Sequence, residues 1–173
     1  MKRIFVGFII SVIYCFSALQ TVHADYVLPY PGYMPGNKLY RVSRVLDQAR
    51  APLYFGSLST YKYHLSLADK YLVEAKVLFE YKQYLLAVDA LARSDKEFVV
   101  LPRYLVQAGK QRKDVSRFEQ QLSEAALMHI QILEELLIKL PDTFTWTPEK
   151  SDATLLPLRD LLLHSMNIRS NVL

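Results

Sequence analysis

The stretch Leu58–Phe79, LSTYKYHLSLADKYLVEAKVLF, decides the fold of this chain. Its apolar positions are spaced alternately by three and four residues, which places them on one face of a helix. These positions are Leu58, Tyr61, Leu65, Ala68, Leu72, Ala75 and Phe79. The spacing therefore predicts a long amphipathic helix, which must bury this face against other helices.

Two later stretches, from Ala87 to Ala108 and from Asp114 to Leu137, show the same spacing. No glycine interrupts residues 57–108, and Gly109 is placed to end the second helix as a C-terminal cap. Only a few residues connect one stretch to the next, and short connections make successive helices antiparallel neighbours. We therefore predict an all-α fold, an antiparallel helical bundle of three long helices.

A short first helix and a C-terminal helix complete the predicted bundle. Asn37 is a good N-cap for a helix over 38–50, which ends before Pro52 because the residue preceding a proline avoids helical backbone angles. The last helix is expected over 155–169. Pro102 lies inside the second long stretch, where it removes a backbone donor, so we expect a kink or a short break there.

The segment between the long helices and the last one, residues 141–151, is predicted to be an internal loop. Thr147-Pro148-Glu149 could begin a helix within it, because proline is favoured at the first helical position and an acid near the positive end of the dipole. No stretch shows the strict alternation of a half-buried strand. Residues 37–173 are therefore expected to form a single helical domain.

The first 24 residues have the pattern of a secretory signal peptide. Lys2 and Arg3 form a basic start, residues 4–19 an apolar run, and Val22-His23-Ala24 a small-residue cleavage site. The apolar run has 16 residues, fewer than the about 20 that a membrane-spanning helix needs. We expect cleavage after Ala24 and a secreted, periplasmic or cell-envelope protein; the alternative is a retained N-terminal membrane anchor.

Cleavage would change the composition in two ways. It would lower the basic residues from 21 to 19 against 17 acidic ones, a balance that does not favour nucleic-acid binding. It would also remove Cys15, the only cysteine, and with it any disulfide or thiolate metal site. The expected partner is an envelope protein or a glycan, and a membrane only if the apolar run is retained.

Residues 25–36 form a lead-in rich in proline, tyrosine and glycine, which precedes the first helix. Proline restricts the backbone, so this segment is expected to be stiff and extended or turning. Its candidate functional residues are Leu28, Pro29, Tyr30, Pro31, Gly32 and Tyr33. They either pack across the bundle with Tyr26 as a structural clasp or present a polyproline-like binding element. Tyrosine suits both roles, because it combines apolar area with a hydroxyl group.

The same region carries a resemblance to a known family. Val27–Tyr40, VLPYPGYMPGNKLY, resembles the start of a secreted bacterial family known as a domain of unknown function, whose members read L-P-Y-P-G-x-x-P and then L-Y before a helical domain. The stretch from His129 to Pro141 is similar to that family's last long helix. The loop after Pro141 is longer than the family pattern, and Pro102 interrupts a helix that members run through. The resemblance implies export and a helical fold, and it supplies no catalytic residues.

Histidines are the best candidates for chemistry outside the signal segment. His129 lies on an apolar stripe with apolar residues at the three- and four-residue distances where a bundle metal site places carboxylates, so we expect a packed, hydrogen-bonded histidine. Asp160 and His164 are four residues apart and could meet on the last helix, which provides half a site at best. His64 lies on another helix. We therefore predict a non-enzymatic protein without cofactor or metal; the alternative is an envelope enzyme or metal-binding bundle that uses His129 or the Asp160 and His164 pair.

A third possibility is a tetratricopeptide-like protein-interaction module. Ala75, Leu78, Tyr84 and Ala87 lie roughly where such a helical hairpin places small and aromatic packing residues. The chain shows no recurrence at the period of about 34 residues that these repeats require. For Tyr61, Tyr71 and Tyr84 we favour a place at the rim of the bundle core over a recognition surface.

Overall fold

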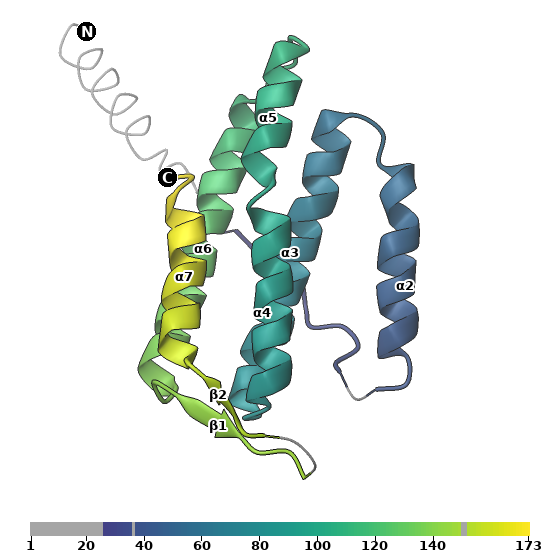
Figure 1. Ribbon diagram of the computed structural model, residues 1–173. Coiled ribbons are helices and arrows are strands. Elements are labelled where there is room, and N and C mark those ends of the chain that lie inside the picture. Colours follow the sequence, from purple (N-terminus) through teal and green to yellow (C-terminus); the bar gives the residue numbers. More distant parts are fainter. Residues whose placement is uncertain (1–25, 36, 150–151) are drawn as a thin grey trace, which may run out of the picture.

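The computed structural model describes residues 26–35, 37–149 and 152–173 (Figure 1). Its helices are α2 (Tyr40–Arg50), α3 (Ser57–Glu80), α4 (Tyr84–Phe98), α5 (Leu101–Lys110), α6 (Ser116–Lys139) and α7 (Leu158–Ser170), with a 3₁₀ turn at Ala51–Leu53. Two short strands, β1 (Phe144–Trp146) and β2 (Thr154–Leu156), precede α7. The predicted all-α bundle is confirmed. The expected signal peptide lies outside the described residues, and no helix within them is long and apolar enough to cross a membrane.

Helix α3 is the centre of the bundle, with α4, α5 and α6 packed against it, and α7 packs in turn against α4 and α6 (Figure 1). The stripe predicted from the sequence is buried from Tyr61 to Phe79, with Tyr61, Ala68, Leu72 and Phe79 almost completely inaccessible, and Leu58 at its start is half-buried. One core cluster joins the C-terminal half of α3 to α4, α6, α7 and β2, and a second joins its N-terminal half to α5 and α6. Tyr61 is a core residue rather than a rim residue, and its hydroxyl donates to the carbonyl oxygen of Phe118 at 3.0 Å.

The predicted second long helix is two helices. α4 ends at Phe98 and α5 begins at Leu101, so the break expected near Pro102 is confirmed. Proline is tolerated at this place because the first turn of a helix has no internal acceptor for its N–H groups. Phe98 and Leu101, on the two sides of the break, both lie in the core cluster that contains Tyr61.

The prediction of a cap at Gly109 is wrong. Gly109 lies inside α5, and the residue with left-handed backbone angles is Arg112, at φ 59°. Lys113 N–H donates to the carbonyl of Ala108 at 3.1 Å, and Arg112 N–H to that of Gly109 at 2.8 Å, which is a Schellman-type ending. The turn after α3 has the same form, with Lys82 at φ 59°.

Within the predicted loop over 141–151, the described residues 141–149 include strand β1, and no helix begins at Thr147-Pro148-Glu149. Strands β1 and β2 pair antiparallel, with Phe144 opposite Leu156 and Trp146 opposite Thr154. α7 consequently begins at Leu158, so Leu155, predicted to be helical, lies in β2. The hairpin is held by packing, because Leu156 is buried in the core and the ring of Phe144 lies 4.6 Å from that of Tyr84. Three-residue strands are too short to show an alternating pattern.

Helix α2 stands at the lateral edge of the molecule, beside α3 and apart from the packed helices (Figure 1). It begins two residues later than predicted, and the Asn37 side chain accepts a hydrogen bond from the Leu39 N–H at 2.9 Å. Tyr40 is the only buried residue of α2. Polar contacts to α3, rather than a shared apolar core, therefore hold it in place.

Candidate functional site

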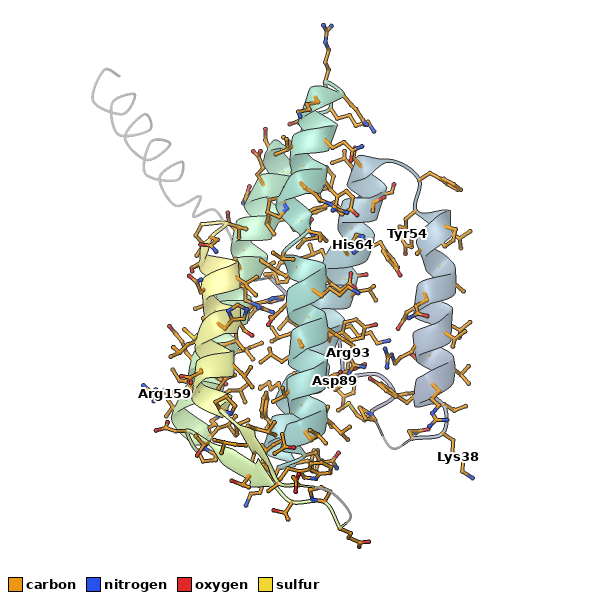
Figure 2. All side chains as sticks on the ribbon, viewed as in Figure 1. Lys38, Tyr54, His64, Asp89, Arg93 and Arg159 are labelled. Atoms are coloured by element: carbon orange, nitrogen blue, oxygen red, sulfur yellow. The ribbon has the colours of Figure 1, made fainter. Side chains whose placement is uncertain are left out.

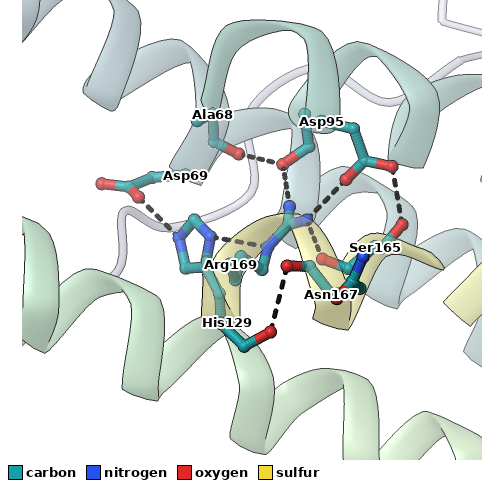
Figure 3. A network of polar contacts seen from close by, with 9 residues as sticks. Ala68, Asp69, Asp95, His129, Ser165, Asn167 and Arg169 are labelled. Carbon is teal, nitrogen blue, oxygen red and sulfur yellow. Dashed lines mark hydrogen bonds and ion pairs between the residues drawn. The ribbon is translucent and has the colours of Figure 1, made fainter. Parts of the chain in front are cut away.

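His129 lies in a buried polar network that joins α3, α4, α6 and α7 (Figure 3). Its Nε2 lies 2.8 Å from Asp69 Oδ1, and its Nδ1 lies 3.2 Å from Arg169 Nε. Both His129 and Arg169 are completely inaccessible. The prediction of a packed, hydrogen-bonded histidine is confirmed.

The network fixes the protonation of His129. A guanidinium can only donate, so Nδ1 must present its lone pair to Arg169. Nε2 then carries the proton and donates it to Asp69. Burial is the main cause that lowers the pKa of His129, while the hydrogen bond to Asp69 acts in the opposite direction. His129 is thus a neutral bridge between a carboxylate and a guanidinium.

Arg169 has its charge and its donors satisfied within the same network. Asp95 lies 2.5 Å from its Nη1, Ser94 Oγ accepts from Nη2 at 2.9 Å, and the backbone carbonyl of Ser165 accepts at 2.8 Å. The Ser165 hydroxyl donates to the other oxygen of Asp95 at 2.6 Å. A buried cation needs this degree of pairing to be tolerated. With every partner already engaged, the network ties helices together and leaves no free group for chemistry.

The second candidate site suggested by the sequence, the pair of Asp160 and His164, is not assembled. Asp160 and His164 are both exposed on α7, and no hydrogen bond or ion pair links these two described residues. Across residues 26–35, 37–149 and 152–173, no three His, Cys, Asp or Glu side chains come together as metal ligands would.

A groove of about 300 Å³ lies between α2 and the hairpin of α3 and α4. We call it the α2 groove. Its floor and one wall are aromatic, formed by Tyr63, His64 and Tyr71 of α3 with Leu67 between them. Figure 2 shows His64 of α3 and Arg93 of α4 in the space that α2 and Tyr54 border. The rings of Tyr54 and Tyr63 lie 5.0 Å apart.

Polar contacts of three α3 residues, Tyr63, Lys70 and Glu74, connect α2 to α3 beside the α2 groove. Lys70 forms an ion pair with Asp47 and donates to Ser43 Oγ at 3.2 Å. The hydroxyl of Tyr63 donates to the Asp47 carbonyl at 2.8 Å, and that of Tyr40 donates to Glu74 at 3.3 Å. Burial raises the pKa of Glu74. The α2 wall therefore rests on hydrogen bonds that water could replace, unlike the apolar contacts of the bundle.

His64 lies at the edge of the α2 groove between a carboxylate and a phenol. Its Nδ1 lies 2.6 Å from Glu97 Oε2, its Nε2 lies 3.1 Å from the Tyr104 hydroxyl, and its ring stacks on that of Tyr104 at 5.1 Å. A carboxylate and a histidine in contact are common in proton transfer. Here, however, the second ring nitrogen is occupied by a tyrosine of the same chain.

The α2 groove has an excess of unpaired positive charge. Asp47 is paired with Lys70 and Glu97 with His64, whereas Arg44 and Lys96 form no ion pair with a described residue. Arg93 contacts Asp89 at 3.3 Å and lies over the ring of Tyr71, yet its Nε is buried without a hydrogen-bond partner. The groove can therefore offer a ligand two cations, Arg44 and Lys96, beside largely buried aromatic side chains.

The lead-in divides into an inner and an outer set of residues. Tyr26 donates from its hydroxyl to Asp69 Oδ2 at 2.6 Å, and Leu28 and Met34 pack against the core. Burial and the negative charge of Asp69 raise the pKa of Tyr26 above its usual range. Tyr30 is 93% exposed, and Pro29, Gly32 and Tyr33 are also exposed, whereas Pro31 is half-buried.

Sequence reasoning missed the α2 groove. His64 and Glu97 are 33 residues apart on different helices, so no local spacing connects them. The one usable signal is the tight turn at 81–83, because an antiparallel hairpin around it places the first half of α3 beside the last turns of α4. Nothing in the sequence indicated that α2 would form the opposite wall.

A family model described as a domain of unknown function (DUF5667) matches residues 32–143. The match covers the end of the lead-in, helices α2 to α6 and therefore both walls of the α2 groove. Comparison with curated proteins gave no match, and neither did comparison with solved structures.

Proposed function

The chain belongs to the family described as a domain of unknown function (DUF5667), and we propose that it is an exported, non-enzymatic module that contacts a protein or glycan of the cell envelope. The proposal combines the signal-like first 24 residues with the α2 groove as the contact site. The family description itself names no activity.

The observation that carries the proposal is the composition of the α2 groove. The cations Arg44 and Lys96, which no described acid neutralises, line the groove together with the largely buried side chains of Tyr63 and Tyr71. Arginine recognises carboxylate groups with two parallel hydrogen bonds, and tyrosine combines apolar area with a hydroxyl group. A partner that carries carboxylates, such as an acidic glycan or an acidic peptide, fits this composition.

A binding role agrees with the state of the titratable groups. His129 has both ring nitrogens engaged in the buried network, and His64 has both engaged by Glu97 and Tyr104. A nucleophile or general base needs a free lone pair directed at a substrate. In His64 and His129 the ring nitrogens are engaged by side chains of the same chain.

Binding to the α2 groove is tested with the double variant Arg44→Gln/Lys96→Gln. We expect the full-length protein to bind soluble acidic cell-wall glycan fragments or acidic envelope peptides in calorimetry, with at least roughly tenfold weaker binding in the double variant. The matched control is Lys139→Gln, which removes an exposed cation of α6 and should leave binding unchanged.

Two results would contradict the proposal. One is equal affinity in the double variant and the control. The other is a hydrolytic or transfer activity of the purified protein that His64→Ala abolishes. Export is tested separately, by intact mass of the protein recovered from expressing cells, which should correspond to a chain that begins at Asp25.

A further inference from the structure

Helix α2 is attached to the bundle by its polar face. Ser43 and Asp47 contact Lys70, and Tyr40 contacts Glu74. Tyr40, Ser43 and Asp47 therefore lie on the side of α2 that faces α3. With 100° between successive residues, the opposite side of the helix carries Val42, Val45 and Ala49. An ordinary surface helix has its apolar stripe toward the core and its polar stripe outside. α2 has the reverse orientation.

The outer face of α2 is apolar and exposed. Val42 is 52% exposed, Val45 63% and Leu46 51%, and Leu53 and Phe55, which follow the helix end in the sequence, are 70% and 82% exposed. We call this set the α2 outer face. Removing apolar side chains of this kind from water is favourable by about 25 cal/mol of free energy for each Å² buried, so several exposed on and directly after one helix favour a partner surface.

Positive charges border the α2 outer face on both sides. Lys38, Arg41 and Arg50 are all exposed, and Lys38 projects away from the bundle at the start of the helix (Figure 2). The one acid of α2, Asp47, is on the inner side and is paired with Lys70. The α2 outer face therefore combines apolar side chains with cations and with no exposed carboxylate of the same helix.

This charge distribution indicates which kind of partner the α2 outer face binds. Two copies that met through their α2 outer faces would bring like-charged side chains together, because a twofold interface places the same patch on both sides. An amphipathic helix with an apolar face bordered by Lys and Arg is instead the pattern that binds anionic lipid in the plane of a membrane surface. We infer that the α2 outer face binds the surface of an anionic lipid bilayer, with Val42, Val45, Leu46 and Phe55 inserted below the headgroups.

The inference is tested in the full-length chain with a single environment-sensitive fluorophore. Cys15→Ser removes the only cysteine, and Val45→Cys then places the label on the α2 outer face. We expect its emission to shift to shorter wavelength with vesicles that contain phosphatidylglycerol, and to be quenched by brominated acyl chains. Vesicles of phosphatidylcholine alone should produce little shift, because the cations then have no anionic headgroups to bind.

Two controls separate this contact from attachment through the N-terminal apolar run. The label at Ile138→Cys, on an α6 position that is 85% exposed, should show no shift with either vesicle. Replacing Lys38, Arg41 and Arg50 by Gln should weaken the response of the label at residue 45 roughly fivefold for each cation removed.

Four results would overturn the inference. The emission of the label at residue 45 could remain at its wavelength in water with both kinds of vesicle, or could shift equally with both. It could shift with rising protein concentration in the absence of lipid, which would indicate a second copy. It could also shift with envelope proteins but not with lipid, which would indicate a protein partner.

Discussion

At the scale of single residues, Arg169 is the side chain on which the interior depends most. It is fully buried near the C-terminal end of α7 and contacts Asp95 and Ser94 of α4 and His129 of α6. Its guanidinium also lies 5.2 Å from the centre of the Phe98 ring. A single side chain thereby connects α7 to both α4 and α6.

Arg169→Met should destabilise the protein by about 3–5 kcal/mol, because removing one partner of a buried ion pair leaves the other charge uncompensated. Chemical denaturation monitored by circular dichroism measures the change. Adding Asp95→Asn to this variant should restore part of the loss. The comparison variant is Arg159→Met, whose exposed pair with Asp142 should cost at most about 1 kcal/mol. Equal losses for the two single variants would show that the buried network contributes little.

His129 should make stability depend on pH. Burial lowers its pKa in the folded protein, so the unfolded chain takes up the proton first as the pH falls. The stabilising contribution is complete above the unfolded value of about 6.5 and decreases as the pH falls from there toward the lower folded value, with a slope of up to about 1.4 kcal/mol per pH unit. Denaturation of wild type and His129→Gln between pH 7.5 and pH 5 measures the difference. Parallel curves would exclude this role.

At the scale of elements, two helices end at residues with left-handed backbone angles, although neither residue is a glycine. Arg112 and Lys82 adopt left-handed angles that a glycine would adopt more easily. Gly109 instead lies on the exposed face of α5, where a residue with a Cβ atom would stabilise the helix more. Among the described residues, the glycine with a positive φ is Gly56, at 84°, directly before α3.

Gly109→Ala should stabilise the protein by about 0.5–1 kcal/mol, because a helical glycine costs that much relative to alanine. A Cβ atom at this position would meet nothing within 4 Å. Gly56→Ala is the opposite case, since its φ of 84° strains any residue with a Cβ atom, and it should be destabilising. Melting temperatures of both variants check the pair. A destabilised Gly109→Ala protein would contradict the placement of this residue in α5.

Element prediction from the sequence worked where a pattern was long and local. The three long stretches, the short first helix and the break at Pro102 were all predictable, because period 3.6 and proline sterics act within a few residues. The β1 and β2 pair was not, because its strands have three residues each and depend on contacts of Phe144 and Leu156 with distant helices. Tertiary packing also decided the orientation of α2.

At the scale of the whole molecule, the lead-in joins the two core clusters. Tyr26 packs against the cluster at the N-terminal half of α3, and Leu28 and Met34 pack against the other one. The hydrogen bond from Tyr26 to Asp69 connects the lead-in to the His129 network as well. This arrangement agrees with a clasp for the inner residues and leaves Tyr30 and Tyr33 available for binding.

Deleting residues 26–35 should lower the melting temperature, because it removes this hydrogen bond and the packing of Leu28 and Met34. Tyr26→Phe should account for about 1–2 kcal/mol of the loss, because it leaves the buried Asp69 with one acceptor unsatisfied. Tyr30→Ala changes an exposed side chain and should leave stability unchanged. If the protein without residues 26–35 melts at the wild-type temperature, the lead-in is a binding element and has no structural role.

The sequence by itself determined the helices, their apolar faces and the burial of His129, because each follows from the positions of neighbours three and four residues away. It did not determine which polar side chains would meet. The pairs Asp69 with His129, Asp95 with Arg169 and His64 with Glu97 arise from how far each helix rotates and slides against the next. Only the tertiary structure decides that rotation, since it results from packing over the whole core. The same packing leaves α2 outside the core with its apolar face toward solvent.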